Sequence, residues 1–133
     1  MTSKQLLQLI KDNVYPDLYI FPDDYAPIDA YSFEKNLWIE VKARTKFFYW
    51  IMIEKHKYDK IVNIKKSRYF ISMPDDYGND KIYSFNFNKL PVPEWKWEER
   101  PVSNGEPNGK WEKVLVAYFH VKQGKDVTSL LLE

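Results

Sequence analysis

The sequence predicts an α/β fold in which helices flank a mixed β-sheet. An amphipathic helical pattern near the amino terminus, several strand-length runs of β-branched and aromatic residues, and a second helical pattern between two of these runs support this class. The chain has 133 residues, 44% of them hydrophobic, which suits a single domain over residues 1–133 with its own core.

The first element is a helix over roughly residues 3–14. Thr2 or Ser3 can cap its amino end, and the helix should end near Tyr15-Pro16 because the residue before a proline resists the α conformation. An apolar stripe would face the core, formed by Leu6, Leu7 and Ile10.

The rest of the chain reads as strands around a second helix. We expect strands at residues 18–21, 27–33, 37–43, 47–53, 68–73, 81–87 and 114–121. The second helix should span residues 54–64, and the apolar tail at 127–132 should dock on the core or on a partner. The inward-facing residues of the second helix should be Tyr58, Ile61, Val62 and Ile64.

Residues 88–111 change character, with four prolines and three tryptophans. We expect an irregular segment whose tryptophans pack over the sheet edge, or alternatively one that stacks on unpaired bases. Pro91 and Pro93 argue against a central strand at Glu94-Trp95-Lys96.

Three charged residues fall in the strands at 27–33 and 37–43, which the polar residues 34–36 join as a hairpin. A turn at Lys35-Asn36 sets Asp29 opposite Lys42, and a turn at Glu34-Lys35 sets Asp29 opposite Glu40. Either register gathers the three on one face, whereas a three-residue loop scatters them unless a bulge intervenes. The opposite face would be apolar, with Ile28, Ala30, Leu37, Ile39, Val41 and Ala43.

Two carboxylates and a lysine on one face form a candidate site for a divalent metal ion. The alternative is an edge strand whose charges face solvent. The large apolar neighbours Trp38 and Ile39 and the apolar run at 47–53 favour the site.

This arrangement resembles the PD-(D/E)XK nuclease superfamily, which has the restriction-endonuclease-like fold and includes Holliday junction resolvases. The resemblance covers roughly residues 3–87 and implies that Asp29 and Glu40 bind Mg²⁺ (or Mn²⁺) and that Lys42 positions the attacking water. Pro27 stands near the family's proline, with Ile28 between it and Asp29.

The resemblance also points to accessory positions. Many members place a Glu on the first helix, where Asp12 is the ionisable carboxylate of this chain. Recombination-type members carry Gln-x-x-x-Tyr on the helix after the lysine, and Glu54 and Tyr58 have that spacing here.

The net charge of +1 gives no global attraction to nucleic acid, so binding requires a local patch. Ten basic and three acidic residues lie between Lys35 and Arg68, a local excess that suits phosphate contacts. The alternative is that these lysines only solvate a surface. The residues expected to contact nucleic acid are Arg44, Lys46, Lys57 and Tyr58.

Composition excludes several other classes of protein. Without cysteine there is neither a disulfide framework nor a thiolate zinc site, and His56 and His120 read as ordinary polar residues. No run is long enough to span a membrane, so we expect a soluble, cytoplasmic protein. Abundant Lys, Asn, Ile, Tyr and Phe indicate an AT-rich genome such as that of a phage.

These observations predict an endonuclease that uses a metal ion to hydrolyse phosphodiester bonds in DNA. In one version of the hypothesis, the enzyme is selective for particular DNA structures. A nuclease of this size usually needs two copies to cut both strands, so we expect a homodimer. The competing hypothesis is a catalytically inactive nuclease-like module that binds nucleic acid or protein.

Overall fold

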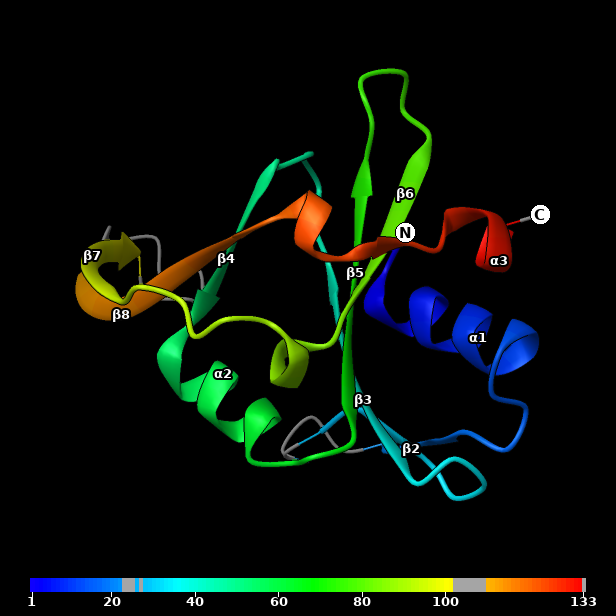
Figure 1. Cartoon of the computed structure of the whole chain (residues 1–133). Helices are drawn as coiled ribbons and strands as arrows, with labels where there is room; N and C mark the ends of the chain where they lie inside the picture. Colours follow the sequence, from blue (N-terminus) through cyan, green and yellow to red (C-terminus); the bar gives the residue numbers. More distant parts are fainter. Residues whose placement is uncertain (23–25, 27, 102–109, 133) are drawn as a thin grey trace.

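Two β-sheets and three α-helices make up the residues described by the computed structural model, namely 1–22, 26, 28–101 and 110–132 (Figure 1). The mixed α/β class expected from the sequence is therefore confirmed. None of the helices in this part of the chain has the length and apolar character needed to cross a membrane.

The larger sheet is mixed, because β3 and β5 are parallel while its other neighbouring strands are antiparallel. Its strand order is β1-β2-β3-β5-β6-β9. The strands are β1 (Tyr19–Ile20), β2 (Ala30–Ser32), β3 (Leu37–Ala43), β5 (Ser67–Pro74), β6 (Asp80–Phe85) and β9 (Lys125–Asp126).

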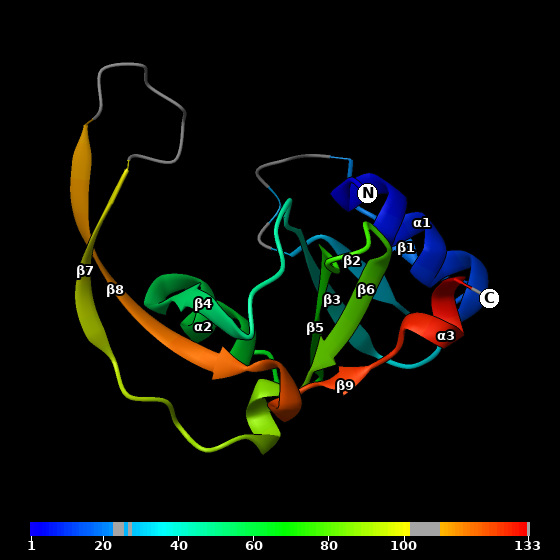
Figure 2. The ribbon, with the colours of Figure 1, turned by 90° about the horizontal axis from the view of Figure 1, so that it is seen from above.

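The smaller sheet is antiparallel and has the order β4-β8-β7. It is formed by β4 (Trp50–Glu54), β7 (Lys96–Pro101) and β8 (Trp111–His120). The strand expected at 47–53 thus exists as β4, but it pairs with β8 rather than joining the hairpin strands. Figure 2 shows β7 and β8 curving away from the larger sheet.

The expectation that residues 88–111 are irregular is wrong for residues 96–101, which form β7. The strand lies at the edge of its sheet, where preceding prolines cost no ladder hydrogen bond. Trp95 packs against Tyr58 of the helix at 55–62 rather than over a sheet edge, with ring centroids 5.1 Å apart, and Trp97 is 68% exposed. Residues 102–109 of this segment lie outside the described residues.

One face of the larger sheet is covered by α1 (Ser3–Asn13) and α3 (Thr128–Leu132), as Figures 1 and 2 show. Thr2 and Gln5 form a capping box at the start of α1, whose buried stripe is the predicted one. This stripe packs in one core with the apolar face of the hairpin, including Ala30, Leu37, Ile39 and Val41.

The other face is covered by α2 (Lys55–Val62), the smaller sheet and two short 3₁₀ helices, η1 (Phe87–Lys89) and η2 (Val121–Gln123). Because side chains alternate along a strand, Glu40 and Lys42 point to this second face. The core here is largely aromatic and includes Tyr58, Tyr69, Phe85, Phe87 and Phe119.

The β2–β3 hairpin adopts one of the two registers left open by the sequence. Ser32 pairs with Leu37 and Ala30 with Ile39, so the same register places Asp29 opposite Glu40. The turn covers residues 33–36 with Glu34-Lys35 at its centre, and Asn36 at its end takes a positive φ of +50°, which asparagine tolerates better than most residues. β2 is shorter than expected and begins at Ala30. Just before it, the Asp29 carboxylate accepts a hydrogen bond from the Val41 N–H of β3, while the Asp29 backbone carbonyl accepts one from the Phe21 N–H. Pro27 lies outside the described residues.

We predict that Ile10→Ala lowers the free energy of unfolding by about 2–5 kcal/mol, because it opens a cavity where α1 packs on the larger sheet. Urea denaturation with an unchanged m value measures the loss. Leu130→Ala in α3 is the control, since that side chain is 56% exposed, and a similar loss in both variants would contradict this packing.

Candidate functional site

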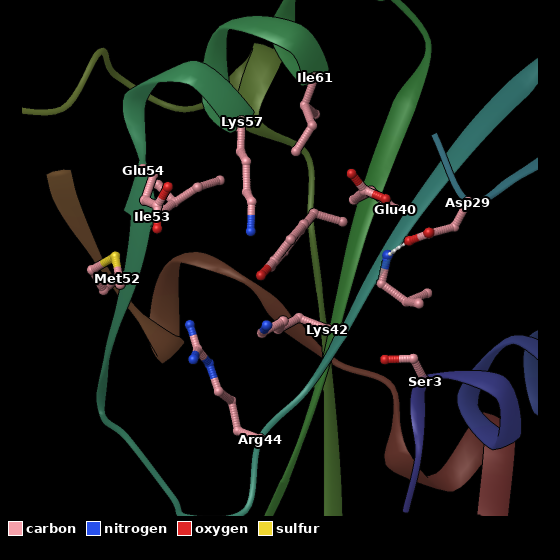
Figure 3. Close-up of a pocket in the computed structure, with 12 residues that line it drawn as sticks. Ser3, Asp29, Glu40, Lys42, Arg44, Met52, Ile53, Glu54, Lys57 and Ile61 are labelled. Atoms are coloured by element: carbon pink, nitrogen blue, oxygen red, sulfur yellow. Dashed lines mark hydrogen bonds between the residues drawn. The ribbon is translucent and has the colours of Figure 1, made fainter. Parts of the chain in front are cut away.

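A pocket of about 240 Å³ opens on the second face of the larger sheet, between β3, β4 and α2. We call it the carboxylate pocket. Figure 3 shows Asp29 and Glu40 close together at one side, while Lys42, Arg44 and Lys57 point into its centre. The structure thus brings together the three residues that the hairpin pattern singled out.

The two carboxylates form a hydrogen-bonded pair. Asp29 Oδ2 accepts a hydrogen bond of 2.9 Å from the backbone N–H of Val41, which holds it beside the neighbouring Glu40. Burial, a hydrogen bond to Asp29 and the charge of Asp29 together raise the pKa of Glu40 from 4.5 to about 9. At neutral pH the Glu40 carboxyl group therefore keeps its proton.

Cations line the rest of the pocket. Burial lowers the pKa of Lys42, and the positive charges of Arg44 and Lys57 lower it further. Lys60 Nζ lies 4.0 Å from Glu40 Oε2, although the Glu40 carboxyl is neutral while it keeps its proton. A lysine with a lowered pKa can accept and release a proton more readily than an ordinary lysine.

Two further predicted residues line the pocket at the start of α2, namely Glu54 and Lys57. Glu54 lies across the pocket from the carboxylate pair (Figure 3) and contacts His56 Nδ1 at 3.3 Å. His56 itself is exposed, as expected from the sequence.

Other predicted residues lie elsewhere. Asp12 is in the last turn of α1, where its carboxylate accepts a hydrogen bond from Gln8, and it does not line the pocket. Lys46 is exposed in the β3–β4 connection and also lies outside the pocket lining. The nucleic-acid contact expected of Tyr58 is wrong, because its ring is 7% exposed and packs against Phe87 and Phe119.

The sequence did not reveal Ser3, Met52 or Tyr69, which also line the pocket. Tyr69 stands beside Glu40 through the parallel pairing of β3 with β5, and burial raises its pKa. Ser3 reaches the pocket from the amino end of α1, the opposite end from Asp12 (Figure 3). Both placements depend on contacts between distant segments that no local pattern signals.

The donor set suits a hard divalent cation. Mg²⁺ typically keeps several waters and binds through one or two carboxylates together with substrate phosphates. Asp29 and Glu40 provide such a pair, and in the described part of the chain no group of three or more His, Cys, Asp or Glu residues could hold a metal. A cation would also replace the proton that the pair holds.

The basic residues between Lys35 and Arg68 divide into separate groups. One group lies in or beside the carboxylate pocket, and another lines a second pocket of about 420 Å³ at the end of the larger sheet where α2 leads into β5. The cations of this lysine pocket are Lys35, Lys65, Lys66, Arg68 and Lys89. Among the described residues, none of the five forms an ion pair with an acidic side chain.

Comparison with protein-family models and with curated protein sequences finds no match to this chain.

We predict that without divalent metal ions the protein loses stability as the pH rises from about 5 to 9. In this range the folded state holds a proton on Glu40 that the unfolded chain has released, so the free energy of unfolding falls by up to about 1.4 kcal/mol per pH unit. Glu40→Gln should flatten this slope in urea denaturation with EDTA. Glu34→Gln, in the exposed β2–β3 turn, should keep it. Equal slopes in the wild type and Glu40→Gln would contradict the assignment.

Proposed function

We propose that this protein is a Mg²⁺- or Mn²⁺-dependent nuclease that hydrolyses phosphodiester bonds in DNA. The observation that carries the proposal is the half-buried Asp29–Glu40 pair next to Lys42. The charge of Asp29 disfavours ionisation of the neighbouring Glu40 despite the nearby lysines, and a divalent cation bound to both carboxylates would remove that penalty.

The resemblance to the PD-(D/E)XK superfamily supports the same proposal. Its metal-binding Asp and Asp/Glu-x-Lys lie on successive strands, and here Asp29 stands opposite Glu40 with Lys42 on the same face. Helices lie on both faces of the larger mixed sheet, which fits a restriction-endonuclease-like fold. The residue of α1 that lines the pocket is Ser3, whereas many family members have a glutamate on this helix.

The chemistry requires a water to attack phosphorus while the oxygen of the neighbouring nucleotide leaves. A Mg²⁺ ion held by Asp29 and Glu40 would activate that water and neutralise charge on the phosphate. Lys42, whose pKa is lowered by burial and by nearby cations, can orient the water and take up its proton. Arg44 and Lys57 point into the same space and can bind the phosphate oxygens.

The lysine pocket supports a polyanionic substrate. Five cations with no ion-pair partner in the described part of the chain repel one another, and backbone phosphates would relieve this repulsion. The loop that carries Lys65 and Lys66 is fixed, since the Asn88 amide donates to the carbonyls of Ile64 and Lys65. Leu37 lines this pocket and Val41 the carboxylate pocket, four residues or about 13 Å apart along β3. One nucleic-acid strand can therefore reach both.

Binding without cleavage is the second candidate function. It is favoured by the serine at the first-helix position of the pocket, where many family members have a glutamate. For cleavage of both strands of a duplex we propose a homodimer, since a nuclease of this size usually needs two copies to cut both strands.

We predict that Lys42→Met lowers the rate of DNA cleavage at least about 100-fold, because the variant cannot accept the proton of the water. Labelled single-stranded, duplex, flapped and four-way DNA, and RNA, with Mg²⁺ or Mn²⁺ form the substrate panel. Lys122→Met, at an exposed position away from the pocket, should cleave like the wild type. Wild-type rates in Lys42→Met would refute the role of Lys42, and binding without cleavage across the panel would favour the inactive module.

We predict that the double variant Lys65→Glu/Lys66→Glu binds DNA at least about 10-fold more weakly than wild type, and that its plot of log affinity against log salt is shallower by about 2. Fluorescence anisotropy of labelled DNA at several salt concentrations measures both effects. Lys122→Glu/Lys125→Glu makes the same change in net charge at exposed positions outside the lysine pocket. If both double variants weaken binding equally, the lysine pocket is not a specific contact.

A further inference from the structure

A third pocket, of about 220 Å³, adjoins the carboxylate pocket and shares Arg44 and Met52 with it. We call it the aromatic pocket. It lies beside the β3–β4 connection and the first residues of β4. Its other walls come from β5, β7 and β8. The lining residues used below are Arg44, Phe48, Trp50, Arg100 and Tyr118. Because Arg44 lines both pockets, a ligand in one lies directly beside a ligand in the other.

Large aromatic rings in this pocket are open to solvent. Phe48 is 45% exposed and Trp50 is 57% exposed, although each would gain free energy by burial. Trp50 is nevertheless held in place, since its ring meets that of His120 at 87° with centroids 4.9 Å apart. Fixed, exposed aromatic faces are the surfaces on which unpaired bases stack.

Two guanidinium groups accompany these rings. The Arg100 guanidinium donates to Glu98 Oε1 at 2.9 Å and to the Tyr118 hydroxyl at 2.7 Å, so its position at the pocket wall is defined. Arg44 extends from the end of β3 toward the carboxylate pocket (Figure 3). Aromatic faces next to arginine match both parts of a nucleotide, the base and the phosphate.

We propose that the aromatic pocket binds one unpaired nucleotide next to the phosphate in the carboxylate pocket. Its base stacks on Trp50 and Phe48, and Arg44 contacts the phosphate that links the two positions. The volume is below the roughly 300 Å³ of pockets for drug-sized ligands, which suits a single base. In a duplex the base faces are covered by their neighbours, so the preferred substrate is single-stranded or carries unpaired nucleotides at the cleavage point.

This inference rests on the proposed function for the role of the neighbouring phosphate, but the stacking itself needs neither metal nor cleavage. The test therefore measures binding in EDTA, by fluorescence anisotropy of a labelled oligothymidylate and of a labelled duplex of equal length. Trp50→Ala should weaken binding to the single strand by about 5- to 150-fold, the effect of losing one stacked base. Its affinity for the duplex should stay at the wild-type value.

Two variants serve as controls. Trp50→Phe keeps an aromatic face and should retain most of the affinity for the single strand. Trp97→Ala removes a tryptophan of similar exposure, 68%, that lies on the smaller sheet but outside the aromatic pocket, and it should bind like the wild type. Equal losses in Trp50→Ala and Trp97→Ala, equal losses on single strand and duplex, or no loss in Trp50→Ala would each overturn the proposal.

Cleavage assays with Mg²⁺ separate this proposal from the nuclease hypothesis. If the wild type binds single strands through Trp50 but cuts no substrate, the aromatic pocket stands and the nuclease function fails. If the wild type cuts DNA and Trp50→Ala binds and cuts single strands equally well, the nuclease function stands and the aromatic pocket fails.

Discussion

The hydrogen bond from the backbone N–H of Val41 to the Asp29 carboxylate connects the fold to the site. It takes the place of a backbone bond at the end of β2 and holds Asp29 across from Glu40. Val41 meanwhile directs its own side chain into the core under α1. The packing of α1 on one face of the hairpin thus fixes the position of the two carboxylates on the other face.

The carboxylate pocket on that second face groups acidic residues together and basic residues together. Asp29 and Glu40 lie together on one side, and Lys42, Arg44 and Lys57 occupy the centre. Burial raises the pKa of Glu40 and lowers that of Lys42, and the like charge of the neighbours in each group adds to the shift. A divalent cation on the carboxylates and a phosphate on the basic residues would neutralise both groups at once.

The sequence predicted where helices and strands occur better than which strands pair with one another. The hairpin strands and both longer helices could be predicted because period-two and helical patterns are local, but the sequence left two hairpin registers open and the structure shows the one that pairs Ala30 with Ile39. The pairing of Trp50 with His120 joins residues far apart in the chain, so the separate smaller sheet was not predictable. Tyr58 was assigned both to the core and to nucleic acid, and the aromatic cluster around it decides for the core.

The central claim is that Asp29 and Glu40 together hold a divalent cation, and calorimetric titration with Mn²⁺ at pH 7 tests it most directly. Repeating the titration in buffers of different ionisation enthalpy counts the protons released. Because Glu40 has a pKa of about 9, the wild type should release about one proton for each ion bound. Asp29→Asn, which can still accept the Val41 hydrogen bond, should lose this binding. No binding by the wild type, or the same heats in Asp29→Asn, would contradict the claim.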